Sequence, residues 1–161
     1  MAVGNQIQHR QEKRKLMEEL IAQAKIVLAN HYAFYLKAQN YHWNVTGPDF
    51  SQYHDLFSKI YNEVGDTIDN LAEQVRAMDS YVPASFSRFS ELAEIEDELN
   101  VPPPLEMIRR LYNDIAIMQN SIMQAYHLAE QHMQHGYSNL MAERQDAFLK
   151  HAWMLKSILK I

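Results

Sequence analysis

The stretch that decides the fold is FSQYHDLFSKIYNEVGDTIDNLAEQVRAM, residues 50–78. Its apolar and aromatic residues recur at alternating steps of four and three, which places them on one face of a helix. The chain is broken just before it by Gly47 and Pro48, and Pro is well tolerated at a helix start. The stretch therefore predicts a long amphipathic helix with one side against a core. That side consists of Phe50, His54, Phe57, Tyr61, Val64, Ile68, Leu71, Val75 and Met78.

Three further segments show the same helical spacing. Before the break, one apolar stripe is formed by Leu20, Ala24, Val27, His31, Tyr35, Ala38 and His42. A third helix is expected from about Leu105 until Gly136 ends it, with Ile108, Leu111, Ile115, Met118, Ile122, Ala125 and Ala129 on its seam. A fourth is expected from about Ser138 to the C-terminus, with Met141, Phe148, Ala152, Leu155 and Leu159 facing inward.

The segment between the second and third helices, residues 79–104, has a different composition. It contains several serines, an acidic patch from Glu91 to Glu98 and three consecutive prolines. We expect a long crossover with one short helix at about residues 91–96. The whole pattern predicts an all-α, ferritin-like four-helix bundle with a short extra helix in the crossover between helices 2 and 3. We expect a single domain over residues 1–161, with residues 1–8 as a flexible N-terminal tail.

Composition and charge exclude several classes of protein. Of the 161 residues, 47% are hydrophobic and 22% charged, as in one compact domain. There is no cysteine, so a disulfide framework, a thiolate metal site and a cysteine nucleophile are excluded. No apolar run approaches the ~20 residues of a membrane span, and we expect a cytoplasmic protein with no membrane partner. The formal net charge of −5 argues against a general affinity for nucleic acid.

Eight histidines suggest a metal site, although a single histidine on an apolar stripe is more often a hydrogen-bonded core residue. The di-iron centre inside a ferritin-like bundle uses the motif Glu-x-x-His, because a spacing of three places both ligands on one inward face. No histidine of this chain has a glutamate three positions before it. The spacing therefore disfavours a carboxylate-bridged site within the bundle.

A different set of ligands lies along residues 50–78. His54, Asp69 and Glu73 share one sector of the helix, but the rise of ~1.5 Å per residue places Asp69 about 22 Å from His54. One ion cannot bridge that distance, because metal–ligand bonds are about 2 Å long. Two copies of this helix packed antiparallel about a two-fold axis would bring His54 of one chain to Asp69 and Glu73 of the other. Gly65 lies near the expected crossing, where its missing side chain lets the helices approach.

Several motifs resemble those of the Dps family, the mini-ferritins that protect bacterial DNA during starvation. The likeness covers about residues 20–160. It rests on the string HWNVTGP at residues 42–48, on the spacing of His54, Asp69, Ala72, Glu73 and Arg76, and on HAWMLKS at residues 151–157. The string with its downstream spacing is far more specific than a single short motif.

The resemblance implies a homo-oligomeric shell of twelve subunits. Such a shell oxidises Fe(II) with hydrogen peroxide or oxygen, stores the ferric product and protects against oxidative damage. Iron, as Fe2+ and Fe3+, is the only cofactor implied, and it binds at two-fold dimer interfaces. His42 and His54 of one subunit, with Asp69 and Glu73 of its mate, are then both the metal ligands and the catalytic residues.

Ser58 departs from the family pattern, which usually has Asp or Glu one turn after the second histidine. A hydroxyl is a poorer ligand than a carboxylate for a hard cation, so the second iron is expected to be weak, water-bridged or absent. Asp66 is either a substitute outer carboxylate or a solvated surface acid. Trp43 is either an acceptor of oxidising equivalents, as the family implies, or a packing anchor.

The charge of the N-terminal segment bears on whether the protein binds DNA. Residues 1–20 carry four basic and three acidic side chains, without the lysine-rich tail of DNA-binding family members. Twelve chains at −5 each would give a shell near −60, so DNA binding is expected to be weak or absent. The alternatives are a DNA-compacting architectural protein with weak or no ferroxidase activity, and a shell without chemistry.

Three residues near the end of the third helix are further candidates. His132 and His135 have the spacing of a metal-binding pair, but capping of the helix C-terminus is the favoured interpretation. Asn139 stands where the family implies an acidic pore residue.

Overall fold

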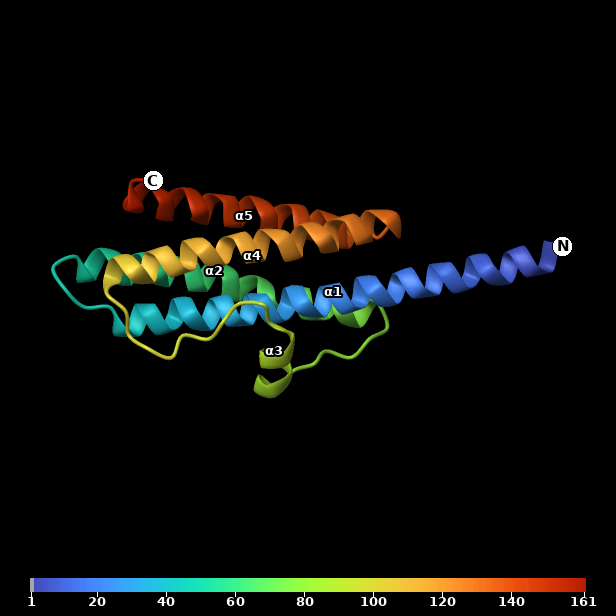
Figure 1. Cartoon of the computed structure of the whole chain (residues 1–161), viewed down its shortest axis with the longest axis horizontal. Helices are drawn as coiled ribbons and strands as arrows, with labels where there is room; N and C mark the ends of the chain where they lie inside the picture. Colours follow the sequence, from blue (N-terminus) through green and yellow to red (C-terminus); the bar gives the residue numbers. More distant parts are fainter. Residues whose placement is uncertain (1) are drawn as a thin grey trace.

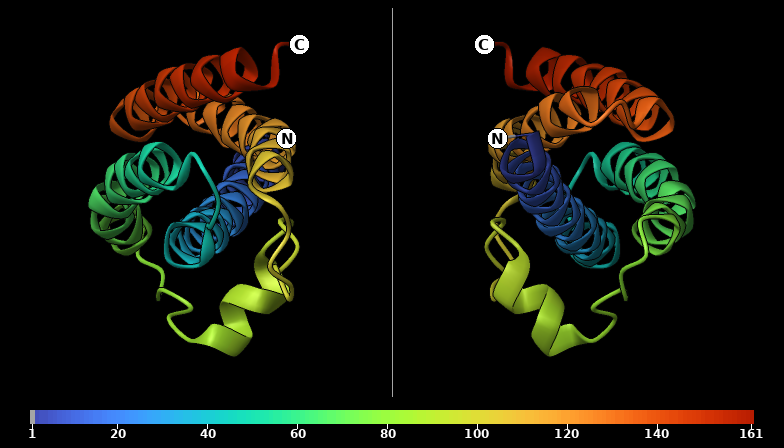
Figure 2. Two further views of the ribbon diagram at one scale, coloured as in Figure 1. Left: turned by 90° about the vertical axis from the view of Figure 1, so that its left-hand side faces the viewer. Right: turned by 90° about the vertical axis from the view of Figure 1, so that its right-hand side faces the viewer.

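The computed structural model describes the backbone of residues 2–161 and the side chains of residue 8 and residues 10–161. The helices are α1 (Ala2–Asn44), α2 (Phe50–Ala77), α3 (Phe86–Leu92), α4 (Pro104–Gln131) and α5 (His135–Leu159). Four long helices form a bundle, and the short α3 lies outside it against α1 (Figures 1 and 2). The predicted all-α four-helix bundle with an extra helix in its crossover is confirmed. No helix in the described part of the chain is long and apolar enough to span a membrane.

The core lies where the periodicity places it. All seven predicted seam residues of α4 are buried, and α2 buries Phe57, Val64, Leu71 and Val75 from its predicted face. Phe50, at the start of that face, stays exposed. The turn between α1 and α2 depends on the glycine at position 47, whose φ of 116° is a conformation that other residues rarely adopt.

Two helix boundaries differ from the sequence prediction. The short helix of the crossover lies at Phe86–Leu92, not at 91–96, because the Ser85 hydroxyl accepts a hydrogen bond from the Arg88 N–H (3.2 Å) and caps it. α4 ends at Gln131, before Gly136. The left-handed residue after it is Met133, with φ 55°, whereas Gly136 lies in the first turn of α5.

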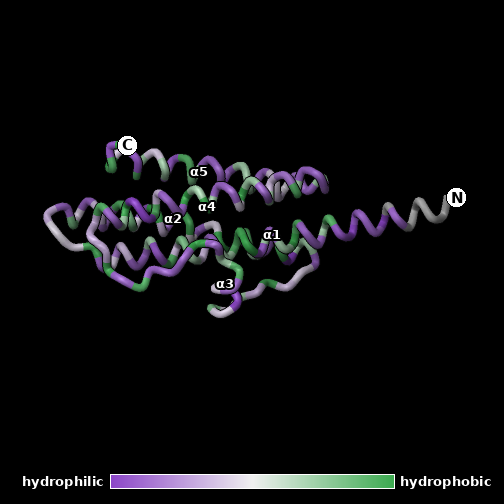
Figure 3. The backbone as a smooth tube through the Cα atoms, viewed as in Figure 1, coloured by the Kyte–Doolittle hydropathy of each residue, from purple (hydrophilic) through white to green (hydrophobic). Residues whose placement is uncertain are grey.

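α1 is much longer than the other helices. Its 43 residues span about 65 Å, and Leu20 is the first buried residue among the side chains that the structure describes. The part before Leu20 extends past the end of the bundle, and residues 10–19 are mostly hydrophilic (Figures 1 and 3). In the predicted flexible tail 1–8, residue 1 lies outside the described residues and the others continue α1. Flexibility of this segment stays a prediction.

The crossover is held against the bundle by two glutamates. Glu94 accepts a hydrogen bond from Asn30 Nδ2 (2.9 Å), and its backbone N–H donates to Asn30 Oδ1 (2.7 Å). Further along, Glu98 Oε2 accepts from the Tyr41 hydroxyl and from Arg110 Nη1, each at 2.7 Å. The acidic patch therefore serves partly to pin the crossover to α1 and α4.

Candidate metal centre

Two of the predicted ligands, His42 and His54, lie together. The short turn after Asn44 returns the chain so that the last turn of α1 meets the first turns of α2. The two imidazole rings stack with centroids 3.7 Å apart and planes 21° from parallel. Both side chains are half-buried, so an ion at the pair would remain accessible from solvent.

The hydrogen bonds of this pair decide its tautomers. Nδ1 of His42 lies 2.8 Å from the carbonyl oxygen of His54, and Nδ1 of His54 lies 2.8 Å from that of His42. Because a carbonyl oxygen only accepts, both Nδ1 atoms must carry the proton. Nε2 is then the nitrogen of each ring that can bind a metal ion. Metal-binding histidines are commonly oriented in this way, by a backbone carbonyl on the other nitrogen.

Aromatic rings flank the histidine pair on both sides. Tyr61 packs edge-on against His42 with ring centroids 5.2 Å apart, and Phe50 packs against His54 at 5.0 Å. These contacts restrict rotation of the imidazoles about their side-chain bonds. The protein alone therefore restricts the orientation of both imidazole rings.

The two predicted carboxylates lie elsewhere on α2. Asp69 and Glu73 are exposed, and Asp69 is about 22 Å from His54 along an unbroken helix. Within the described residues, no three His, Asp or Glu side chains are close enough to share a metal ion. One chain thus brings together His42 and His54 only, and sharing of the site between chains stays a prediction.

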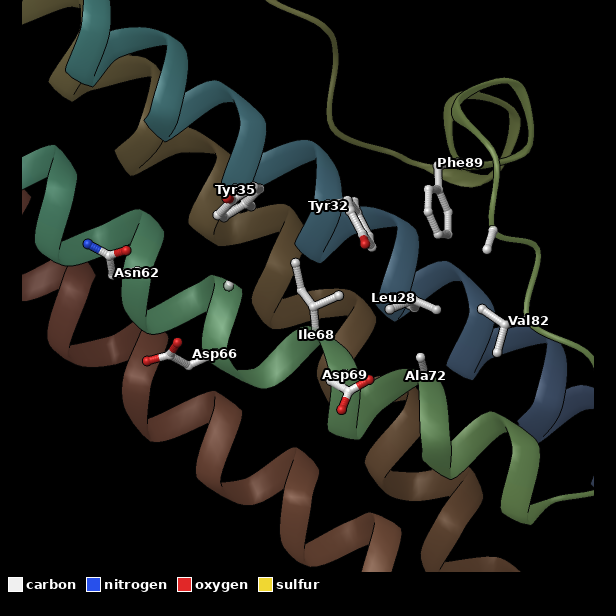
Figure 4. A pocket seen from close by; sticks show the side chains of 12 residues that line it. Leu28, Tyr32, Tyr35, Asn62, Asp66, Ile68, Asp69, Ala72, Val82 and Phe89 are labelled. Atoms are coloured by element: carbon white, nitrogen blue, oxygen red, sulfur yellow. The ribbon is translucent and has the colours of Figure 1, made fainter.

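Asp69 borders a hollow of about 400 Å³ between α1, α2 and α3 (Figure 4). Asp66 and Gly65 also line it. A Cβ added at Gly65 would lie 2.9 Å from Cε2 of Tyr35. This glycine therefore already serves a close contact within its own chain, in addition to the helix crossing expected between chains.

The structure also places the other residues that the sequence singles out. The Ser58 hydroxyl accepts a hydrogen bond from Asn62 Nδ2 (3.2 Å), one turn along α2. Trp43 is 62% exposed, so it is not a packing anchor within one chain. His132 caps the end of α4, and His135 lies in α5 with Nδ1 3.5 Å from Glu130 Oε1. Asn139 and Glu143 are exposed on α5.

A second polar cluster lies inside the bundle, and sequence reasoning missed it. Arg144 donates from Nε to His31 Nε2 (3.2 Å), and its two terminal nitrogens bind both oxygens of the Glu63 carboxylate. His151 Nε2 donates to Glu63 Oε2 (2.8 Å). A signal was present, because Arg144 and His151 continue the inward steps of three and four through Phe148 on α5.

Burial and charge shift two pKa values in this cluster. Complete burial, with the nearby Arg144 cation, lowers the pKa of His31 from 6.5 to about 3. Burial raises the pKa of Glu63, but hydrogen bonds from His151 and Arg144 and their charges outweigh it and lower the value to about 2. At neutral pH the cluster therefore holds a neutral His31 and an ionised Glu63.

Comparison with known proteins gives a consistent set of similarities. The model of the ferritin-like domain matches residues 21–161. The DNA protection during starvation protein of Brevibacillus brevis is 29% identical over 133 residues, covering 83% of this chain and 89% of that protein. General stress protein 20U of Bacillus subtilis is 28% identical over 144 residues, covering 89% and 99%.

Solved structures agree with the sequence comparisons. Dps from Thermosynechococcus elongatus superposes with a TM-score of 0.89 at 26% identity, covering 92% of this chain and 94% of that one. A Dps protein from Vibrio cholerae O1 gives a TM-score of 0.86 at 27% identity, covering 90% and 91%. The latter is described as a member of a broad superfamily of ferritin-like diiron-carboxylate proteins.

Proposed function

Because this chain belongs to the ferritin-like family, and within it to the Dps proteins, we propose that it is an iron-oxidising and iron-storing mini-ferritin. It takes up Fe(II), oxidises it with hydrogen peroxide or oxygen and retains the ferric product. It thereby protects its host from oxidative damage.

The histidine pair carries this proposal. His42 and His54 each engage Nδ1 in a reciprocal hydrogen bond, which leaves Nε2 as the nitrogen that can bind a metal ion. Iron(II) accepts imidazole nitrogen together with carboxylate oxygen. Asp69 and Glu73 supply that oxygen from the two-fold mate, since their own chain holds them too far away.

The electron balance explains why a second iron matters. Reducing hydrogen peroxide to two water molecules breaks the O–O bond and consumes two electrons and two protons. Each Fe(II) supplies one electron, so two irons are needed to reduce one peroxide completely. With two irons, peroxide is not left at the stage of a one-electron reduction. Ser58 offers a hydroxyl where a second carboxylate would hold the second ion, so that ion binds more weakly than the first.

The proposed assembly and setting follow from the shared site. A site built by two chains needs at least a two-fold dimer, and the Dps likeness supports a dodecamer with its sites at two-fold interfaces. Identical subunits of net charge −5 attract Fe(II) to the shell. We place the protein in the cytoplasm, where Fe(II) and peroxide meet.

One assay tests the proposal directly. Anaerobic protein loaded with Fe(II) is titrated with hydrogen peroxide while ferric absorbance is followed, and size-exclusion chromatography then shows where the iron is. We expect about one peroxide consumed per two Fe(II), with the ferric iron eluting with the protein. Iron that oxidises no faster than in buffer and elutes apart from the protein would contradict the proposal.

DNA compaction is the rival function, suggested by the name of the Brevibacillus brevis relative. Part of the basic charge on α1 is already neutralised, because Arg14 Nε contacts Glu18 Oε1 at 3.0 Å. We therefore expect no retarded complex with duplex DNA at about 0.15 M salt, where charges are screened beyond ~8 Å. A stable complex at that salt and neutral pH, without ferroxidation, would favour the rival.

Ser58→Asp tests the weak second iron. The new carboxylate stands one helical turn from His54 and supplies a hard oxygen ligand. We expect a few-fold faster oxidation or a higher Fe(II) stoichiometry by calorimetry. Ser157→Asp, which adds the same charge on α5, is the matched control and should change neither. If Ser58→Asp titrates like the unmodified protein, another residue already fills this role.

A further inference from the structure

A pair of tyrosines follows the histidine pair along the bundle. Tyr35 lies seven residues before His42 on α1, and Tyr61 lies seven residues after His54 on α2. Seven residues are close to two helical turns, about 10 Å, so tyrosine and histidine share one face of each helix. Because α1 and α2 run in opposite directions side by side, the two tyrosines meet in the layer next to the histidines (Figure 1).

The rings of these two layers touch in a row. Tyr61 packs edge-on against His42, with centroids 5.2 Å apart and planes at 68°. Tyr35 packs edge-on against Tyr61, with centroids 5.8 Å apart and planes at 81°. Both geometries are those of aromatic rings in direct edge-to-face contact. The row therefore runs without a gap from a proposed iron ligand to Tyr35.

Tyr35 is held firmly at the far end of the row. It lies between α1 and α2, where Gly65 leaves space for its ring (Figure 4). Its hydroxyl oxygen accepts a hydrogen bond from Gln39 Nε2 (3.0 Å), and that bond persists and stabilises the oxygen when the hydroxyl loses its hydrogen. The next steps of seven reach Leu28 and Ile68, whose aliphatic side chains are much harder to oxidise. The row of oxidisable rings ends at Tyr35.

Trp43 does not belong to this row, although it follows His42 directly in the sequence. It lines a separate hollow with Leu36 and Leu99. Among the described residues its ring contacts neither imidazole of the pair. Tyr61 is thus the oxidisable ring that packs against a ligand of the proposed site.

We propose that Tyr61 and Tyr35 are a reversible electron store for the iron site, an inference that rests on the proposed function. With Ser58 holding the second iron weakly, peroxide meets a single Fe(II) and gains one electron. The products are Fe(III), hydroxide and a hydroxyl radical. Tyr61 then gives the hydrogen atom of its hydroxyl group to that radical, which leaves water and a tyrosyl radical.

The store is refilled by iron. Tyr35 passes one electron to the Tyr61 radical and loses a proton to solvent, while Tyr61 takes one up, so the radical rests beside Gln39. The next Fe(II) gives one electron to the tyrosyl radical, which takes up one proton and becomes tyrosine again. In sum, two Fe(II), one peroxide and two protons give two Fe(III) and two water molecules. The tyrosines therefore leave the overall stoichiometry unchanged but prevent escape of the hydroxyl radical.

The test adds hydrogen peroxide to protein that carries one Fe(II) per site. We expect a tyrosyl signal by electron paramagnetic resonance after rapid freezing. Tyr61→Phe keeps the ring but lacks the oxidisable hydroxyl, so it should lose most of this signal and release several-fold more hydroxyl radical to a spin trap. Tyr126→Phe is the matched control and should change neither, because this half-buried tyrosine lies in the last two turns of α4, away from the histidine pair (Figure 1).

Two further variants separate this store from a merely structural role. Tyr35→Phe should leave the radical on Tyr61 and shorten its lifetime. Ser58→Asp, loaded with two Fe(II) per site, should weaken the tyrosyl signal because a bound second iron supplies the electron. The inference is wrong if ferric iron forms without a tyrosyl signal and Tyr61→Phe releases no more radical than the unmodified protein. Absence of ferric iron in every sample would instead refute the proposed function, and this inference with it.

Discussion

Mixing two inactive variants should restore iron oxidation. His54→Ala removes an imidazole from one half of the proposed site, and Asp69→Ala removes a carboxylate from the other half. After the subunits are dissociated and reassembled together, each mixed dimer has one site lacking both groups and one site that is intact. Random pairing makes half of the dimers mixed, so about a quarter of all sites should regain activity.

The matched control mixes His42→Ala with His54→Ala. Both imidazoles of a site come from one chain in this scheme, so every site in the mixture still lacks one and no activity should return. Scattering must show that the shell has re-formed in both mixtures. Equal activity of the two mixtures would refute the shared site, because a site built within one chain cannot be complemented.

Acid should destabilise the fold from about pH 6.5 downward, ahead of ordinary carboxylate titration. An unfolded His31 takes up a proton near pH 6.5, whereas the buried ring does so only near pH 3. The unfolded chain binds more protons between these values, so the free energy of unfolding falls as the pH falls. The loss over the whole window is on the order of 5 kcal/mol.

Protonation of Glu63 causes a second loss of folding stability at lower pH. Its pKa is about 2 when folded against 4.5 when unfolded, so its contribution is present above pH 4.5 and is lost towards pH 2. The carboxylate is about one-third exposed, and solvent screening limits this part to roughly 2 kcal/mol.

Urea unfolding measured at a series of pH values checks both losses. His31→Gln should flatten the dependence between pH 6.5 and 4.5 while lowering stability at neutral pH. His127→Gln on the exposed side of α4 is the control and should leave the profile unchanged. A profile of the unmodified protein that stays level down to pH 4.5 would show that His31 is not the titrating group.

The sequence predicts the bundle well because its apolar periodicity is strong. The ends of the helices depend instead on individual capping residues and on local backbone conformation. The α4 seam is buried at every expected position. The short crossover helix was misplaced because acidic residues suggested a helix, whereas the Ser85 cap decides where one begins. Gly136 was misread as a terminator because a non-glycine residue, Met133, adopts the left-handed conformation instead.

The candidate site was predictable only in part. Spacing along one helix shows that His54 and Asp69 cannot share an ion within a chain, yet the reciprocal bonds of His42 and His54 depend on the angle between two helices. The burial of Arg144 was not predicted, because an arginine is normally expected on the surface of a protein. Its role depends on partners from two other helices, α1 and α2, which no local pattern encodes.

The crossover also shapes how the chain folds. The α1–α2 and α4–α5 hairpins close over short turns, so their formation costs little chain entropy. Docking one hairpin on the other must close the long segment between Ala77 and Pro104, and contacts distant in sequence form more slowly than local ones. The bonds of Asn30 to Glu94 and of Tyr41 to Glu98 divide that closure into shorter loops. Two acidic side chains of the crossover thus shorten the loops that remain to be closed when the halves of the protein come together.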